Sequence, residues 1–382
     1  MNDSSAITLS VEAVKNNIAF LRKHLSSSAK ISAVIKANAY GHGIEQVVPI
    51  FEEQGIDHFS VFDYCEAVQA RKSLKGQAAI MIMGWISEDN MENVIRQGFE
   101  FFVFSLDRFK QAAAIAQSKG MKARIHLEVE TGMNRSGLNE EELGIVLDMI
   151  ERQPDCFEVK GFCSHLAGPE SVSNYLRIQE QIKRFKALYD LLRKRHIKPA
   201  YRHIANSAGA FVYPEIQMDL VRIGIMLYGF WSSTEVFIHH VRTKINKQDP
   251  LQRILRWSSS VMSVKEIQEG EFVGYGLSYL AQRPLKTALI PVGYSKGYNR
   301  SLGNKGRVLI NGYRCGVIGM VNMNMIMADV TDVPEVQIGD EVVIIGKQGE
   351  LEIKVSAFSN ISNELNYEVL AHLSESINRI IE

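Results

Sequence analysis

Lys36 ends a short apolar run and is followed at once by a glycine-rich turn, in the stretch 33–43 that reads Ala-Val-Ile-Lys-Ala-Asn-Ala-Tyr-Gly-His-Gly. A lysine at the end of a buried strand is costly to keep charged, so we expect the pKa of its amine to fall. A neutral amine is the form that attacks an aldehyde. The alternative is a lysine whose side chain follows the strand end to solvent. The stretch therefore marks Lys36 as a candidate nucleophile.

Polar residues also follow the later apolar runs in the first part of the chain. They are Arg135, His165, Asn206, Ser207 and Arg222, the last of which is followed by Gly224 and Ile225. In a parallel barrel the functional groups lie at the C-terminal ends of the strands, so we expect these residues to gather on one rim. A single histidine in such a place is more often a hydrogen-bonded core residue. The prediction of a site therefore depends on the whole set.

Eight apolar runs rich in branched side chains predict the buried strands that would position these residues. They span residues 31–35, 58–62, 79–83, 101–104, 123–129, 159–164, 201–204 and 221–227. Amphipathic helical stretches lie between them, and another precedes the first. Strands and helices alternating in this way predict an α/β fold, a (β/α)8 TIM-type barrel over residues 1–235. A doubly wound open sheet is the structural alternative.

The rest of the chain has a different pattern. Residues 231–252 are polar and mixed in charge, and we interpret them as a connector. Beyond them, short apolar runs such as 259–267 alternate with turns such as Asn311-Gly312, and residues 360–373 favour a helix. The sequence therefore predicts a mostly β domain over residues 250–382.

The composition excludes several classes of partner. The chain of 382 residues carries 43 Lys and Arg against 43 Asp and Glu, so we expect neither nucleic acid nor an anionic membrane as a partner. No apolar stretch approaches the roughly 18 residues that span a bilayer, and the N-terminal residues 1–5 lack the features of a signal peptide. The four cysteines, which lack metal-ligand spacing, are Cys65, Cys156, Cys163 and Cys315. We expect reduced thiols, no metal site and a cytoplasmic location.

Motifs in order along the chain resemble those of the alanine racemase family. They are residues 35–43 (its lysine motif), 131–137 (its Thr-Gly-Met-x-Arg-x-Gly), 164–167 (its Thr-His-Phe-Ala), 204–208 (its Asn-Ser phosphate segment), 222–229 (its Arg-Pro-Gly-x-x-x-Tyr-Gly), 274–276 (its catalytic tyrosine), and 293–298 and 366–369 (two further signatures). The resemblance covers nearly the whole chain, which is thereby identified as a member of the family.

The resemblance implies a reaction and an assembly. Pyridoxal 5'-phosphate would be held on Lys36 as an imine. In a head-to-tail homodimer with active sites at the subunit interface, the β domain of one subunit would bring Tyr275 to the cofactor of the other. Racemisation removes the α-proton from one face and returns a proton to the opposite face, so Lys36 and Tyr275 would act as two acid/base groups.

The resemblance also implies roles for the residues around the cofactor and the small amino-acid substrate. Arg222 would face the pyridine nitrogen and His165 the ring. Arg135 would bind the substrate carboxylate with the backbone N–H of Met323, and Tyr294 would narrow the entrance. The expected phosphate ligands are Tyr40, Asn206, Ser207, Gly224, Ile225 and Tyr367, the last of which also limits the size of the substrate.

Two departures from the family pattern bear on the site. Glu128 stands where many members have a lysine that carries a carbamate, and we hypothesise that Glu128 holds Arg135 directly. Asn324 replaces an acidic residue near the entrance. The predicted reaction is the conversion of L-alanine to D-alanine for peptidoglycan synthesis. A serine or broad-specificity racemase, a non-catalytic protein that binds pyridoxal phosphate, and a decarboxylase of the same fold are the alternatives.

Overall fold

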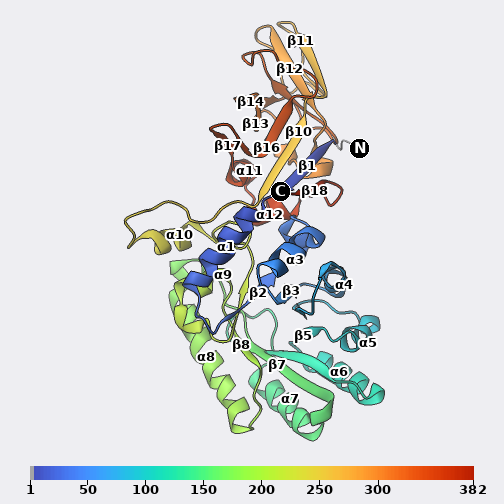
Figure 1. Cartoon of the computed structure of the whole chain (residues 1–382), viewed down its shortest axis with the longest axis vertical. Helices are drawn as coiled ribbons and strands as arrows, with labels where there is room; N and C mark the ends of the chain where they lie inside the picture. The colour runs from blue at the N-terminus through green and yellow to red at the C-terminus, as the bar shows by residue number, and fades with distance from the viewer. Residues whose placement is uncertain (1–3) are drawn as a thin grey trace. The chain divides into compact units, whose positions relative to one another are not determined.

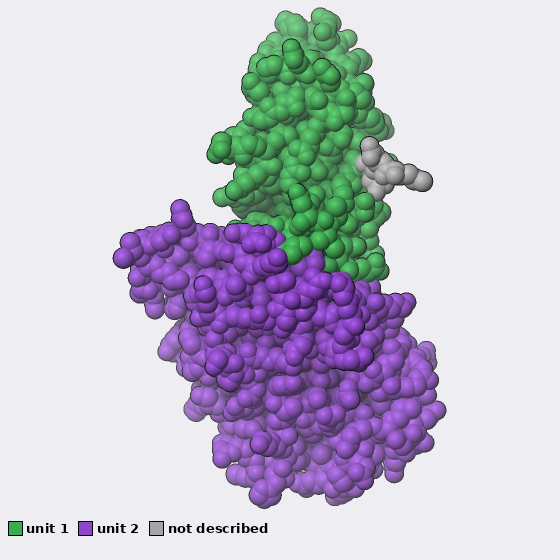
Figure 2. Space-filling view, viewed as in Figure 1, with its two compact units in different colours: residues 1–11, 37–46, 253–382 green, residues 12–36, 47–252 purple. Residues whose placement is uncertain are grey.

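The computed structural model describes residues 4–382; residues 1–3, part of the N-terminal segment for which no signal peptide is predicted, lie outside the described residues. The chain divides into two compact units (Figure 2). Unit 1 comprises Met1–Val11, Ala37–Gln46 and Arg253–Glu382, and unit 2 comprises Glu12–Lys36 and Val47–Gln252.

Unit 2 contains a parallel sheet in the strand order β8-β7-β6-β5-β4-β3-β2-β9. Figure 1 shows helices around the strands of this unit. A parallel bridge between Asn206 and Arg222 joins the β8 side of this sheet to β9, so the eight strands form a nearly closed barrel. The strands are β2 (Lys30–Val34), β3 (His58–Val61), β4 (Ala79–Ile82), β5 (Glu100–Val103), β6 (Ala123–Glu128), β7 (Phe157–Cys163), β8 (Tyr201–His203) and β9 (Leu220–Ile223). The predicted TIM-type barrel is confirmed.

One helix precedes the first of these strands and others lie between the strands. They are α1 (Val11–His24), α3 (Ile44–Glu53), α4 (Tyr64–Ser73), α5 (Glu88–Arg96), α6 (Leu106–Lys119), α7 (Glu140–Arg152), α8 (Tyr175–Lys194) and α9 (Ser207–Val212). The short element α2 (Lys36–Tyr40) is the left-handed turn described below. Strands β3, β5 and β9 are buried along their whole length, because the barrel interior covers one face and helices the other. This two-sided burial explains why the strands appear in the sequence as continuous apolar runs.

Two predictions within unit 2 need correction. Strand β9 ends at Ile223, four residues before the predicted end, and residues 225–229 form tight turns. The apolar pattern continues beyond the strand because Ile225, Met226 and Leu227 are buried in those turns. The segment 231–252, predicted as a connector, contains the helix α10 (Thr234–Val241), which Ser233 caps by accepting a hydrogen bond from Val236 N.

Unit 1 is a mostly antiparallel sheet in the order β11-β12-β15-β14-β13-β16-β10-β1-β18, with β17 paired to β16. Its elements are β1 (Ser5–Leu9), β10 (Leu255–Ser260), β11 (Ser263–Ile267), β12 (Leu285–Ile290), β13 (Arg307–Ile310), β14 (Tyr313–Ile318), β15 (Ile326–Asp329), β16 (Glu341–Gln348), β17 (Leu351–Ile353), β18 (Asn378–Ile381), α11 (Val355–Ser362) and α12 (Asn366–Ala371). The predicted mostly β character is confirmed. The strand β1 was not predicted, and the expected helix 360–373 is two short helices separated by Asn363 in a left-handed conformation.

Five short 3-10 helices complete the described residues. They are η1 (Pro154–Cys156), η2 (Val172–Asn174), η3 (Pro214–Ile216), η4 (Tyr294–Lys296) and η5 (Arg300–Leu302). Between residues 4 and 382, no helix is long and apolar enough to cross a membrane.

Candidate active site

Lys36 stands where the buried strand β2 gives way to a left-handed turn. The four residues that follow, Ala37 to Tyr40, all have φ between 50° and 55°. Hydrogen bonds close the turn, from Gly41 N to Ala37 O at 3.0 Å and from Gly43 N to Asn38 O at 2.9 Å. Side chains with a Cβ are strained in this conformation. The local backbone is therefore unusual at the residue for which the sequence predicts the chemistry.

The surroundings of Lys36 favour its neutral form. Burial lowers the pKa of the amine and the positive charges of Arg135 and Arg222 lower it further, against an opposing effect of Glu66. Water still reaches much of the Lys36 side chain, which moderates the shift. Within residues 4–382, Lys36 Nζ has no hydrogen-bond or ion-pair partner. The amine is thus available to react.

Arg222, on β9, is only 3% exposed and is fixed by groups at the ends of β7 and β8. Its Nη2 donates to Ser164 O at 2.7 Å, its Nη1 donates to His203 O at 3.2 Å, and Nη1 also bonds His203 Nδ1. A longer contact of 3.4 Å joins Nη2 to His165 Nδ1. These contacts occupy the two terminal nitrogens, and no described residue accepts from Nε. One N–H donor of a rigidly held cation therefore remains for a ligand.

His165, two residues beyond the end of β7, lies within electrostatic reach of the three predicted cations of the barrel. Burial lowers its pKa to about 3, and the charges of Arg222, Arg135 and Lys36 contribute in that order. The His165 ring is therefore neutral at ordinary pH. The charges of Lys36, Arg135 and Arg222 all act on His165. This is expected if the four residues gather at the C-terminal ends of the strands.

Glu128 ends β6 and is 4% exposed. Burial raises the pKa of its carboxyl, although Arg222, a hydrogen bond from Ser136 and Arg135 oppose the shift. Ser136 Oγ donates to Glu128 Oε2 at 3.1 Å. Among the described residues, no ion pair within 4.0 Å joins Glu128 to Arg135, whose side chain is exposed. The contact made here is with Ser136 rather than the direct contact to Arg135 that we hypothesised.

The predicted phosphate ligands of the barrel lie on two adjacent segments. Asn206 begins the helix α9, and its side chain accepts a hydrogen bond from Gly209 N at 2.8 Å. Ser207 Oγ accepts from Gly224 N at 3.0 Å, and both residues are buried, as is Ile225. The loops after β8 and β9 therefore bring a serine hydroxyl and glycine backbone together, as the chemistry of a phosphate site requires.

In unit 1, the 3-10 helix η4, which begins at Tyr294, contacts the loop that holds Met323 and Asn324. Tyr294 N donates to Asn322 O at 3.1 Å, and Ser295 Oγ donates to Asn324 Oδ1 at 2.7 Å. A Cβ on Gly293 would lie 2.2 Å from Asn322 O, so this approach requires glycine. Tyr294 and Met323 remain 44% and 56% exposed, which leaves both available to a ligand.

Tyr40 and Tyr367 also come together within unit 1, with ring centroids 6.1 Å apart. Tyr40 ends the left-handed turn and Tyr367 lies in the first turn of α12. The turn is held against this region by Arg379, whose Nη2 donates to Gly41 O at 2.8 Å. Two of the predicted phosphate and entrance residues are thus neighbours, although they are more than 300 positions apart in the sequence.

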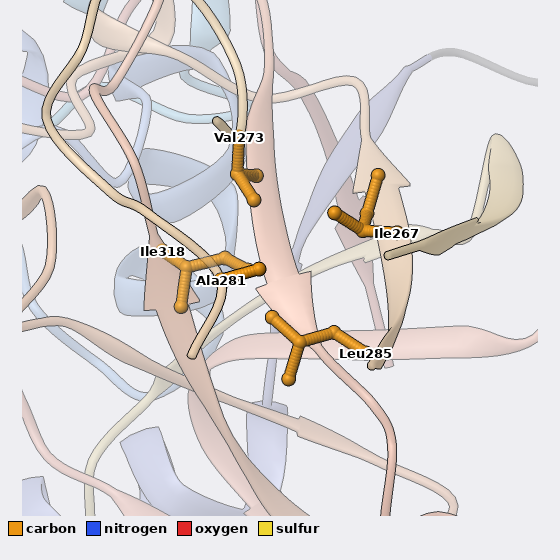
Figure 3. Close-up of a cluster of buried hydrophobic side chains, with 5 residues drawn as sticks. All are labelled: Ile267, Val273, Ala281, Leu285 and Ile318. Carbon is orange, nitrogen blue, oxygen red and sulfur yellow. The ribbon is translucent and has the colours of Figure 1, made fainter. Parts of the chain in front are cut away.

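Tyr275 lies on the loop between β11 and β12 and is 77% exposed. Apolar side chains anchor this loop (Figure 3), and they converge from both ends of the loop and from three strands. They are Ile267, Val273, Ala281, Leu285 and Ile318. A hydrogen bond from Val273 N to Tyr279 O at 2.9 Å closes the tip. Tyr275 is therefore held out from unit 1 on an anchored loop.

One group of residues was not found by sequence reasoning. Four buried side chains inside the barrel form a series of hydrogen bonds that ends at Arg222. The series runs from His58 to Glu100, His126 and His203. The signal was present, because His126 is a polar residue within the predicted buried strand 123–129 and must have a partner there. Its partners, however, come from other strands.

A nearly closed parallel barrel with a lysine, two arginines and a histidine near the C-terminal strand ends, joined to a mostly β unit, defines a class of two-unit barrel enzymes. Residues 9–231 match the family model described as "Alanine racemase, N-terminal domain", and residues 254–381 match "Alanine racemase, C-terminal domain". The chain belongs to the alanine racemase family. It is an amino-acid racemase, an enzyme of the isomerase class, as the motifs predicted.

Individual relatives agree with this assignment. Alanine racemase 1 of Clostridium acetobutylicum is 36% identical over 369 residues, which cover 96% of this chain and 93% of that protein. The structure of alanine racemase from Clostridium difficile 630 has a TM-score of 0.90 at 26% identity and covers 99% of this chain and 95% of that one. Alanine racemase from Bartonella henselae, solved with covalently bound pyridoxal phosphate, has a TM-score of 0.84 at 28% identity over all of both chains.

Proposed function

We propose that this protein interconverts L-alanine and D-alanine with pyridoxal 5'-phosphate bound at Lys36, and that Lys36 and Tyr275 of the partner subunit move the protons. The observation that carries the proposal is the arrangement around Arg222. Neighbouring groups fix both terminal nitrogens of this arginine and leave Nε as a donor, while Lys36 lacks any hydrogen-bond or ion-pair partner among the described residues.

The donor set of the barrel fits this cofactor. Lys36 would hold it covalently, and Arg222 Nε–H would face the ring nitrogen. Ser207, Gly224 and Ile225 would bind the phosphate, with Asn206 fixing the start of α9. When bound, pyridoxal phosphate supplies a ring that withdraws electrons from the α-carbon of an amino acid.

Arg222 would moderate that withdrawal of electrons. A guanidinium does not lose its proton in proteins, so Arg222 would donate a hydrogen bond to the ring nitrogen and leave that nitrogen unprotonated. A carboxylate in this position would instead favour protonation of the nitrogen and stronger withdrawal. The weaker withdrawal beside Arg222 would favour simple return of a proton over side reactions such as transamination.

The amine of Lys36 is suited to take and return the α-proton. Its pKa is lowered by burial and by Arg135 and Arg222, so a fraction of the amine is neutral at ordinary pH. Racemisation also needs a second acid/base group on the opposite face of the substrate α-carbon. We assign this role to Tyr275 of the partner subunit. Tyr275 is exposed together with Phe272 and Leu277 on the same loop, which supports an interface between two copies of this chain there.

The substrate carboxylate requires a cation. We assign Arg135 and the backbone N–H of Met323 to it, with Tyr294 and Tyr367 restricting the side chain to a small one. Serine is the alternative substrate, because Asn324 puts a neutral amide near the entrance where the family has an acidic group, and Ser295 Oγ donates a hydrogen bond to this amide. We further propose that the D-alanine serves peptidoglycan synthesis. A cytoplasmic location stays a prediction of the cysteine pattern.

Deuterium exchange tests the reaction. The holoenzyme is incubated in deuterated water with L-alanine or L-serine, and optical rotation and α-deuterium are followed. Racemisation with exchange, faster for alanine, is expected. A cofactor absorbance band without exchange would leave a binding protein without turnover and contradict the proposal.

Mixed dimers test the second base. Lys36→Ala and Tyr275→Phe variants are unfolded together and refolded with the cofactor. Each variant alone should be inactive, and the mixture should recover about a quarter of wild-type activity, because half of the dimers then carry one intact site. No recovery would mean that Tyr275 does not act across the dimer.

A further inference from the structure

A continuous chain of buried polar side chains crosses the interior of the barrel and ends on Arg222. Glu100 begins β5 and is 3% exposed, whereas His126 on β6 and His203 on β8 are fully buried. His126 Nε2 lies 2.7 Å from Glu100 Oε2, and His126 Nδ1 lies 2.8 Å from His203 Nε2. His203 Nδ1 bonds Arg222 Nη1. Three hydrogen bonds thus connect a carboxylate to the arginine.

The two ends of this chain fix the position of every proton in it. A guanidinium can only donate, so His203 Nδ1 must accept and the proton of this ring lies on Nε2. His203 therefore donates to His126 Nδ1, and the His126 proton also lies on Nε2. An ionised carboxylate can only accept, and Glu100 accepts from His126. All three hydrogen bonds run in the same direction, from Arg222 to Glu100.

The charge states agree with this assignment. Burial lowers the pKa of His126 and holds the pKa of His203 well below its ordinary value, which favours the neutral rings that the hydrogen-bond directions require. Burial raises the pKa of Glu100, but hydrogen bonds from His126 and His58 outweigh that effect and hold it well below its ordinary value. Two neutral histidines thus separate a buried anion from a buried cation.

We propose that Glu100 and His126 are positioning residues for racemisation: by holding His203 with its proton on Nε2, they keep Arg222 oriented with Nε–H free for the cofactor. If His203 carried its proton on Nδ1, two N–H groups would face each other and Arg222 would have to turn away. The inference rests on the proposed function only in assigning the cofactor's ring nitrogen to Arg222. The orientation of Arg222 itself is a property of the barrel.

His58 provides a matched comparison. It is as buried as His126 and its Nε2 lies 3.3 Å from the same Glu100 oxygen, but its Nδ1 lies 2.8 Å from Ser32 Oγ. Ser32 in turn bonds Ser60. This branch leads away from Arg222, so a change at His58 perturbs the same carboxylate without breaking the connection to the arginine.

A metal site is the competing interpretation of the same residues. The ligand atoms of His58, Glu100 and His126 lie within 4.8 Å of one another, a spacing that a divalent cation can use. The hydrogen bonds described above already satisfy Glu100 Oε2, and the ammonium of Lys160 lies 3.8 Å from Glu100 Oε1, where it opposes a second cation. The observations therefore favour the hydrogen-bonded chain.

The test combines proton positions with kinetics. Nitrogen-15 spectra of histidine-labelled protein, with and without cofactor, report which ring nitrogen of His203 carries the proton, and kcat and KM are measured for alanine. In His126→Phe the acceptor for His203 is lost, so we expect a mixed or reversed His203 tautomer and a fall in kcat of about 10- to 100-fold, the range seen for outer partners of a ligating group. KM should change little.

Two variants separate positioning from general damage to the core. His126→Asn offers an oxygen near the former Nδ1, so it should keep the His203 proton on Nε2 and most of kcat. His58→Phe should lower thermal stability yet leave the His203 tautomer and kcat unchanged. Should His126→Phe fail to fold, the wild-type spectrum and His126→Asn still decide the question.

Several results would overturn the proposal. They include a wild-type His203 proton on Nδ1, wild-type kcat in His126→Phe, a loss in His126→Asn as large as that in His126→Phe, or a loss of kcat in His58→Phe. Shifts of the His58 and His126 nitrogens on addition of zinc would favour the metal site instead. If the wild-type protein does not racemise alanine, the proposed function fails, while the tautomers still test the positioning of Arg222.

Discussion

Glu128 is a buried carboxylate whose pKa is raised, because burial penalises its charge more than Arg222, Ser136 and Arg135 favour it. The folded protein therefore binds this proton more tightly than the unfolded chain. The associated stability is fully present below the ordinary value of 4.5 and is lost as pH rises through the folded pKa. We predict that Glu128→Gln unfolds at higher urea than wild type at neutral pH, by about 1 kcal/mol, and loses this advantage near pH 4.

Urea unfolding of the cofactor-free protein at the two pH values checks this prediction. A less stable Glu128→Gln at neutral pH would mean that the two arginines require the negative charge. In that case Glu128 would serve chiefly as a counter-ion, which is closer to the role that the sequence suggested.

Single residues show where sequence reasoning succeeds and where it stops. Lys36, Arg222 and Ser207 could be predicted, because each follows an apolar run and parallel strands bring such positions to one rim. Glu100 and His126 could not be recognised as a pair, because their hydrogen bond depends on which side chains of neighbouring strands face the interior together. The contact of Glu128 with Ser136 likewise depends on a side-chain conformation that spacing does not determine.

At the scale of elements, the left-handed turn after β2 stores backbone strain. Ala37 is exposed and has φ 53°, a conformation that costs roughly 1–2 kcal/mol for a residue with a Cβ. We predict that Ala37→Gly raises the free energy of unfolding by about 1 kcal/mol, since glycine adopts this conformation without a Cβ clash. Ala37→Val should lower it. Urea unfolding measures both, and a less stable Ala37→Gly would show that the strain is relieved in another way.

The loop that carries Tyr275 allows a matched pair of glycine substitutions. Both glycines have positive φ, 79° at Gly274 and 84° at Gly270. A Cβ added to Gly274 would lie 3.6 Å from Met327 Sδ, and a Cβ added to Gly270 would have no neighbour within 4 Å. Each change to alanine should cost about 1 kcal/mol of backbone strain. Only Gly274→Ala adjoins Tyr275, so we predict a fall in kcat of about tenfold or more for it alone.

Steady-state kinetics and thermal unfolding of the two variants test this prediction. An equal loss of kcat in Gly270→Ala would mean that the anchoring of the whole loop matters rather than the position of Tyr275.

The predicted boundaries of the strands were wrong where the apolar pattern could not distinguish a buried strand from a buried turn. Buried strands and buried turns have the same composition, so the prediction continued β9 through residues 225–227, which are buried in a turn. The strand β1 was missed because its partners, β10 and β18, lie at the other end of the sequence. The predicted strand 259–267 proved to be the end of β10 and all of β11, separated by a break that no glycine or proline marks.

At the scale of the whole molecule, buried neutral histidines predict sensitivity to acid. His42, His126 and His203 are fully buried, and burial is the main cause that lowers the pKa of each, for His42 to about 4. Because each folded pKa is depressed, the stability is present above the ordinary value of 6.5 and is lost as pH falls through it. Between that value and its own folded pKa, each histidine should cost about 1.4 kcal/mol of stability per pH unit.

Urea unfolding at about pH 7.5 and pH 5 measures this loss, which should amount to about 2 kcal/mol for His42. His126→Asn, which removes another of the three, should show a shallower dependence on pH. A stability that is constant between these pH values would mean that the histidines are charged in the folded protein.

The strand β1 lies between β10 and β18, and Ser5 pairs with Ser259. On the ribosome, β1 thus waits for a partner that lies about 250 residues further along the chain, an interval of roughly 12–50 s at ordinary elongation rates. The barrel can assemble during that delay, whereas β1 must stay unpaired and exposed to chaperones and proteases. Vectorial synthesis therefore separates the making of β1 from its folding, because this strand finds its partners only after the barrel strands have been made.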